Sequence, residues 1–149
     1  MRDKLAKAFE DAMAGTDKRR ACMMRLIAAA VRDRDVTMRA GGRDRLCELE
    51  IQDLLRTMVR QREAAAIGFE KGGKPQRAAD ERAEIGIIAE FLPEPLVAGE
   101  MEAACREVVA DTGSRGLRDV GRAMTALRNR YGGRMNFADA SIVVRDLLR

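Results

Sequence analysis

Residues 87–96 read Ile-Ile-Ala-Glu-Phe-Leu-Pro-Glu-Pro-Leu and mark a break in the helical pattern of the chain. Pro93 ends the segment before it, because a residue that precedes a proline is displaced from helical backbone angles. On both sides of this break, apolar residues recur at three- and four-residue spacing, and no stretch alternates as a strand does. The pattern predicts an all-α, multihelical fold with an N-terminal four-helix lobe, residues 1–92, and a small C-terminal three-helix lobe, residues 93–149.

Four helices are predicted before the break, and glycine or proline separates them. Gly15 is expected to end the first helix in a left-handed conformation. Asp17 and Asp44 are suited to cap the N-termini of the second and third helices. Pro75 fits the first turn of the fourth helix, where no backbone N–H is needed. The predicted limits are residues 2–13, 17–39, 44–69, and 75 to the break.

Three shorter helices are predicted after the break. The first covers residues 99–111, the second starts after Gly116 and stops at Gly132-Gly133, and the third runs from an Asn136 cap to the C-terminus. Asp119 falls three residues after Gly116, where a carboxylate can accept hydrogen bonds from free N–H groups of the first turn. Gly121 is expected to allow close packing of its helix against another.

The composition excludes several classes of site. The 149 residues include no histidine and no tryptophan, so histidine-based nucleophiles and histidine-ligated zinc are excluded. The three cysteines form no CxxC pair, which favours buried free thiols in a reducing compartment. No long apolar run is present, so the sequence predicts a cytoplasmic protein with no membrane partner. It indicates no catalytic residue, no metal site and no cofactor.

Basic residues form the main functional signal. The formal net charge is +4, and the part from Arg115 to the C-terminus holds eight arginines against three acids. On the second helix, Lys18, Arg25, Arg32 and Arg39 recur every seven residues and form one stripe. Guanidinium groups match phosphate oxygens in geometry, so these faces suggest a nucleic-acid contact. Ordinary solvated surface is the alternative interpretation.

The chain resembles the stand-alone GatB/YqeY family, which is related to the tail of the B subunit of tRNA-dependent amidotransferase. The motifs that carry the resemblance keep a common order and spacing along nearly the whole chain. They are DKRRACMMRLIAAA at 17–30, RQREAAAIGFEKGG at 60–73, ERAEI at 81–85, FLP at 91–93, TG at 112–113 and DVGRAM at 119–124.

The resemblance implies an all-helical accessory protein that contacts tRNA and has no catalytic site of its own. By family association the activity is that of a carbon–nitrogen ligase with glutamine as amido-N-donor, whose chemistry belongs to other domains and subunits. An amidotransferase or another protein is a further implied partner, and no DNA specificity is expected. A module that docks an acidic partner or a multisubunit enzyme is the alternative function. The candidate tRNA-binding residues are Arg115, Arg118, Arg122, Arg130 and Arg134, followed by Lys18, Arg19 and Arg25.

Overall fold

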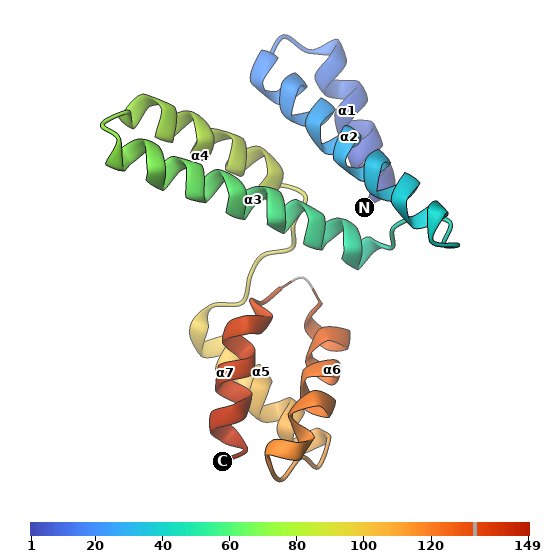
Figure 1. Ribbon diagram of the computed structural model, residues 1–149, viewed down its shortest axis with the longest axis vertical. Helices are drawn as coiled ribbons and strands as arrows, with labels where there is room; N and C mark the ends of the chain where they lie inside the picture. The colour runs from blue at the N-terminus through green and yellow to red at the C-terminus, as the bar shows by residue number, and fades with distance from the viewer. Residues whose placement is uncertain (133) are drawn as a thin grey trace. The chain divides into compact units, whose positions relative to one another are not determined.

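The computed structural model describes residues 1–132 and 134–149, which contain seven α-helices, one 3₁₀ helix and no strand (Figure 1). The predicted all-α fold is therefore confirmed. The helix stop predicted at Gly132-Gly133 falls partly outside the described residues. The chain divides into two compact units, Met1–Leu92 and Pro93–Arg149, and each unit has a hydrophobic core of its own.

The N-terminal unit consists of two helical hairpins. Its helices are α1 (Arg2–Ala14), α2 (Lys18–Ala40), α3 (Glu48–Lys71) and α4 (Pro75–Ala89). Helix α1 packs on α2, α3 packs along α4, and α2 also contacts both α3 and α4 (Figure 1). Met23, Ile27, Leu55 and Ile88 are fully buried where these helices meet. This core is aliphatic and sulfur-rich, as the scarcity of aromatic residues requires.

Local signals explain most of the helix ends in this unit. The Asp17 side chain accepts a hydrogen bond from the Arg20 N–H at 3.0 Å, and Pro75 is the first residue of α4, so both predictions are confirmed. The prediction for Gly15 is wrong, because this residue has a φ of −86° and is extended. Among the residues that the structure describes, the left-handed glycines are instead Gly42, Gly73 and Gly113.

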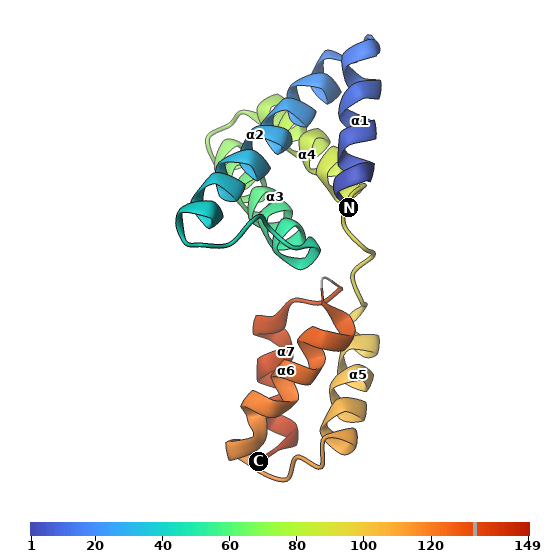
Figure 2. The ribbon, with the colours of Figure 1, turned by 90° about the vertical axis from the view of Figure 1, so that its right-hand side faces the viewer.

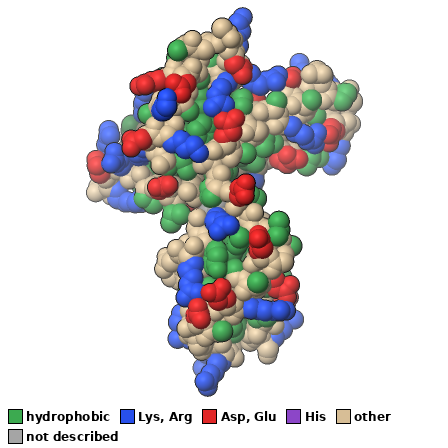
Figure 3. Space-filling model, turned by 180° about the vertical axis from the view of Figure 1, so that it is seen from behind, with side chains coloured by type: hydrophobic (Ala, Val, Ile, Leu, Met, Phe, Trp, Pro, Cys, Tyr) green, Lys and Arg blue, Asp and Glu red, His purple; other side chains and the backbone are tan. Residues whose placement is uncertain are grey.

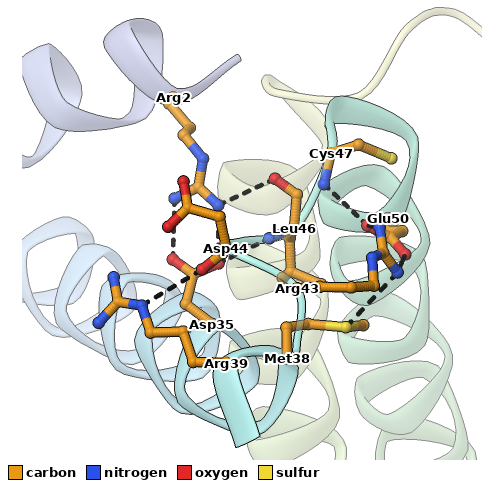
Figure 4. A network of polar contacts seen from close by, with 9 residues as sticks. All are labelled: Arg2, Asp35, Met38, Arg39, Arg43, Asp44, Leu46, Cys47 and Glu50. Atoms are coloured by element: carbon orange, nitrogen blue, oxygen red, sulfur yellow. Dashed lines mark hydrogen bonds and ion pairs between the residues drawn. The ribbon is translucent and has the colours of Figure 1, made fainter. Parts of the chain in front are cut away.

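A partly buried ion pair holds the start of α1, the end of α2 and the segment before α3 together (Figure 4). The Arg2 guanidinium donates to both carboxylate oxygens of Asp35, at 2.9 and 2.7 Å, and also to the Leu46 carbonyl at 3.0 Å. Asp35 in turn accepts the Leu46 N–H at 2.9 Å. The hydrogen bonds from Arg2 lower the pKa of Asp35. One carboxylate on α2 thus accepts hydrogen bonds from two other segments and joins all three.

The start of α3 differs from the prediction, because the helix begins at Glu48 and not after a cap at Asp44. The Glu50 carboxylate accepts the Cys47 N–H at 2.8 Å and binds the Arg43 guanidinium at 2.6 and 3.0 Å. The Leu46 N–H donates to Asp35 and the Leu46 carbonyl accepts from Arg2, so neither group is available for helical hydrogen bonds just before Cys47. Glu50 therefore provides the N-terminal hydrogen bond that the sequence suggested for Asp44.

The C-terminal unit packs three α-helices around a second core (Figure 2). Its elements are α5 (Ala98–Asp111), the 3₁₀ helix η1 (Leu117–Asp119), α6 (Val120–Tyr131) and α7 (Phe137–Leu147). Val108, Leu127 and Val144 contribute fully buried side chains from the three α-helices. The prediction for Gly121 is wrong, because this residue is exposed and a Cβ there would meet no atom within 4 Å.

The three cysteines are free, but only Cys105 is buried. Cys22 and Cys47 are exposed, so the expectation of buried thiols holds for one cysteine and is wrong for two. Burial raises the pKa of the Cys105 thiol, which keeps it protonated and unreactive. In the part of the chain that the structure describes, no helix is long and apolar enough to cross a membrane.

Candidate functional site

Two of the candidate arginines line an open hollow in the C-terminal unit. The hollow has a volume of about 680 Å³, and Arg115, Arg118 and Arg149 lie around it together with Leu117 and Leu148. The η1 turn carries Arg118, and the end of the chain after α7 brings Arg149 to the same place. Arg149 was not among the sequence candidates, since only the packing of α7 places it beside η1. Three arginines from two segments, the turn at 115–119 and the end of the chain, therefore line one open surface.

Asp119 shapes the backbone of this hollow. Its carboxylate accepts the Arg115 N–H at 2.9 Å, and this hydrogen bond holds the pKa of Asp119 below its usual range. The Asp119 N–H donates to the Gly116 carbonyl at 2.9 Å and closes the turn. The carboxylate thus reaches back as predicted, but to an N–H that precedes the helix, and Asp119 makes no side-chain cap hydrogen bond to the first turn of α6. The carboxylate also brings negative charge into the hollow, which reduces its net positive charge.

The candidate arginines near η1 differ in how their charge is compensated. Arg122 forms an ion pair with Asp119 at 3.0 Å, and its side chain is 57% exposed. Within residues 1–132 and 134–149, the guanidinium groups of Arg115 and Arg118 have no carboxylate partner. An anion can approach these two groups without first displacing a carboxylate. Arg115 and Arg118 are therefore better placed than Arg122 to bind phosphate.

Arg130 and Arg134 lie at the other end of α6, about 18 Å from η1 for a helix of this length. Arg130 donates to Asp111 at 2.7 Å, which raises the pKa of the guanidinium, and a weaker ion pair joins it to Glu107 at 3.9 Å. Arg134 donates from Nε to the Glu94 carbonyl at 3.5 Å. Both side chains hold segments of the C-terminal unit together, so the structure does not join them with Arg115 and Arg118 in one cluster.

The candidates in the N-terminal unit also include both ion-paired residues and residues without an ion-pair partner. Arg19 on α2 binds Asp80 on α4 at 2.7 Å and so connects two helices. Lys18 and Arg25 are exposed, and neither has an ion-pair partner among the residues that the structure describes. On the face shown in Figure 3, basic and acidic side chains are intermingled over both units. The positive charge is thus dispersed, and the local arrangement of each arginine matters more than the total.

The described residues contain no group of three or more histidine, cysteine, aspartate or glutamate side chains that could hold a metal ion. The side chains of the hollow that could hold an anion by hydrogen bonds and charge are Arg115, Arg118 and Arg149. The guanidinium fork donates two parallel hydrogen bonds to a phosphate group, and exposed arginines do so without needing a deep pocket.

Comparison with known proteins places the chain in a family. No curated protein matches the chain. A family model described as Yqey-like protein matches residues 2–148, and so covers both compact units. The motifs noted in the sequence all lie within this matched region. The chain therefore belongs to the YqeY-like protein family.

Proposed function

We propose that this protein is a tRNA-binding accessory protein, related to the tail of tRNA-dependent amidotransferase, and that it carries no catalytic site of its own. Membership of the YqeY-like family supports the relationship. In this proposal the C-terminal unit, residues 93–149, is the tail-like domain that contacts the tRNA body. The carbon–nitrogen ligase chemistry, with glutamine as amide donor, is performed by a different protein with which this one acts in the cytoplasm.

The observation that carries the proposal is the hollow lined by Arg115, Arg118 and Arg149. These side chains extend from a turn and a chain end, so a curved phosphate backbone can meet all three at once. Arg115 and Arg118 have no carboxylate to release among the described residues. Such contacts recognise phosphates and not base edges, and they select tRNA by its shape.

The test is a fluorescence-anisotropy titration with bulk tRNA, and with duplex DNA of equal charge, at several salt concentrations. The wild-type protein is expected to bind tRNA more tightly than the DNA. Because each phosphate contact contributes roughly 0.9 to the slope of log affinity against log salt for duplexes, the double variant Arg115→Ala/Arg118→Ala should lower that slope by about two.

The matched control is Arg106→Ala/Arg145→Ala, which removes the same charge from exposed positions of α5 and α7 in the same unit. This control should leave the slope nearly unchanged. Equal loss of slope in both double variants would show that total charge, and not the hollow, governs binding. Weak and equal binding to tRNA and DNA would contradict the proposal and favour an acidic protein as the partner of these residues.

A further inference from the structure

A groove of about 530 Å³ runs between α1 and α2 in the N-terminal unit. Its floor is apolar, with Leu5 and Phe9 from α1 and Met24, Ile27 and Val31 from α2. Leu5, Met24 and Ile27 are buried core residues, whereas Phe9 and Val31 are half-buried and pack against the core. The groove is thus an opening onto the core of the unit, where apolar side chains from outside could continue its packing.

The groove is elongated in the direction of α2. Its lining residues on this helix extend from Met24 to Arg39, which corresponds to about 22 Å of helix rise. Val36, which is 57% exposed, extends the apolar surface near one end. This length matches about four turns of a second helix lying against the hairpin. Figure 3 shows hydrophobic side chains on the surface of the N-terminal unit between charged ones.

The charges along the groove are asymmetric. Arg32 and Arg39 line its α2 side, and both belong to the seven-residue basic stripe of that helix. Arg32 has no ion-pair partner among the described residues, and Arg39 donates only to the Asp44 carbonyl, at 3.2 Å. Two acids also line the groove: the carboxylate of Asp35 is occupied by the arginine at the start of α1, and Glu10 lies on the α1 side. The α2 side therefore presents two accessible guanidinium groups about 10 Å apart along the helix.

A nucleic acid does not match this combination. Its backbone would contact the arginines but leave the apolar floor in water, and base stacking needs more aromatic surface than the single ring of Phe9 provides. A peptide helix uses both features, because its apolar stripe covers the floor while carboxylates beside the stripe reach Arg32 and Arg39. Carboxylates seven residues apart on one helix face have the required spacing.

We propose that the groove between α1 and α2 binds an amphipathic helix of a partner protein, with an apolar stripe flanked on one side by aspartate or glutamate. The partner is thereby recognised by chemistry distinct from that of the arginine hollow in the C-terminal unit. The protein has two separate binding surfaces, one for phosphate and one for an acidic helix, each on its own compact unit.

The experiment uses the full chain and two fluorescein-labelled helical peptides of four turns. Both carry leucines at three- and four-residue spacing, and one has glutamates beside the stripe where the other has lysines. The glutamate peptide is expected to bind about tenfold more tightly, as two exposed ion pairs would produce. The variant Arg32→Glu/Arg39→Glu should reverse this preference. Because the assay contains no RNA, its result is independent of the proposed tRNA function.

Two further variants keep the test decisive. Ala28→Gln narrows the groove without a change in charge and should weaken binding of the glutamate peptide. Arg106→Glu/Arg145→Glu makes the same charge reversal in the C-terminal unit and should leave the peptide preference unchanged, after circular dichroism has shown that each variant is folded. Equal binding of both peptides would overturn the proposal. Two other results would also overturn it. In the first, the chain self-associates in sedimentation and Ala28→Gln abolishes that association, so the groove binds a second copy. In the second, neither peptide binds and Ala28→Gln lowers the affinity for tRNA, so the groove belongs to the RNA-binding surface.

Discussion

Replacement of Asp35 by alanine should destabilise the N-terminal unit by about 3 kcal/mol, because three hydrogen bonds depend on this carboxylate and its removal leaves a partly buried cation. The Asp35 side chain is 13% exposed and that of Arg2 is 30% exposed. Two of the lost hydrogen bonds are charge-assisted and come from Arg2, and the third comes from the Leu46 N–H. Asp35→Asn, which keeps the shape and one acceptor, should cost less than Asp35→Ala.

The assay is urea unfolding followed by far-UV circular dichroism, with tyrosine fluorescence recorded on the same samples. Tyr131 is the only tyrosine in the sequence, there is no tryptophan, and its ring packs on the core of the C-terminal unit. Its fluorescence transition should therefore stay where it is in the wild type, while the dichroism transition of the N-terminal unit moves to lower urea. Asp33→Ala is the matched control, since Asp33 is exposed on the same helix and should change stability by less than about 0.5 kcal/mol.

Acidification tests the same ion pair. The hydrogen bonds from Arg2 lower the pKa of Asp35 in the folded state, so its contribution to stability is present above the ordinary carboxyl range and is lost as pH falls through the folded pKa. The stability difference between wild type and Asp35→Ala should be constant near neutral pH and shrink below about pH 4. A difference under about 1 kcal/mol at neutral pH, or one that grows on acidification, would refute the reasoning.

Three further predictions concern the C-terminal unit and can be read from Tyr131 fluorescence during urea unfolding. Leu127→Ala removes a fully buried side chain and should cost about 2–5 kcal/mol, whereas an unchanged midpoint would place Leu127 outside the core. Asn136→Ala removes the acceptor of the Ala138 N–H and should cost about 1 kcal/mol, while Asn136→Asp should retain stability. Gly113→Ala should lower the free energy of unfolding by about 1 kcal/mol, because this residue has a φ of +63°. Gly121→Ala should raise it by about 1 kcal/mol, because this residue lies exposed in a helix. Effects of equal sign would contradict the assignment of these two conformations.

Local sequence patterns were sufficient for the helical fold and for several helix ends. The side-chain caps at Asp17 and Asn136 and the proline at the start of α4 depend on residues within one turn of each other, so they can be recognised without tertiary information. The start of α3 could not be recognised in this way. Its position depends on Asp35 binding Leu46, a contact that joins residues from different segments.

The candidate site was predicted only as a set of basic residues. Contacts between residues distant in sequence decide which of these basic residues have a carboxylate partner, as the ion pairs of Arg19 with Asp80 and of Arg130 with Asp111 show. Periodicity shows which helix face carries an arginine, but it does not show whether a carboxylate from another helix lies opposite. This is why Arg118 and Arg130 were indistinguishable in the sequence and have different surroundings in the structure.

The amino-acid order alone therefore decided the helical class, the break at Pro93 and the excess of arginine, since backbone preference and composition act over a few residues. Tertiary packing alone decided which arginines have accessible charge, how Arg149 joins the hollow beside η1, and where α1 and α2 leave an apolar groove. These features arise where separate helices meet, and the geometry of such a meeting depends on every side chain in the core between them.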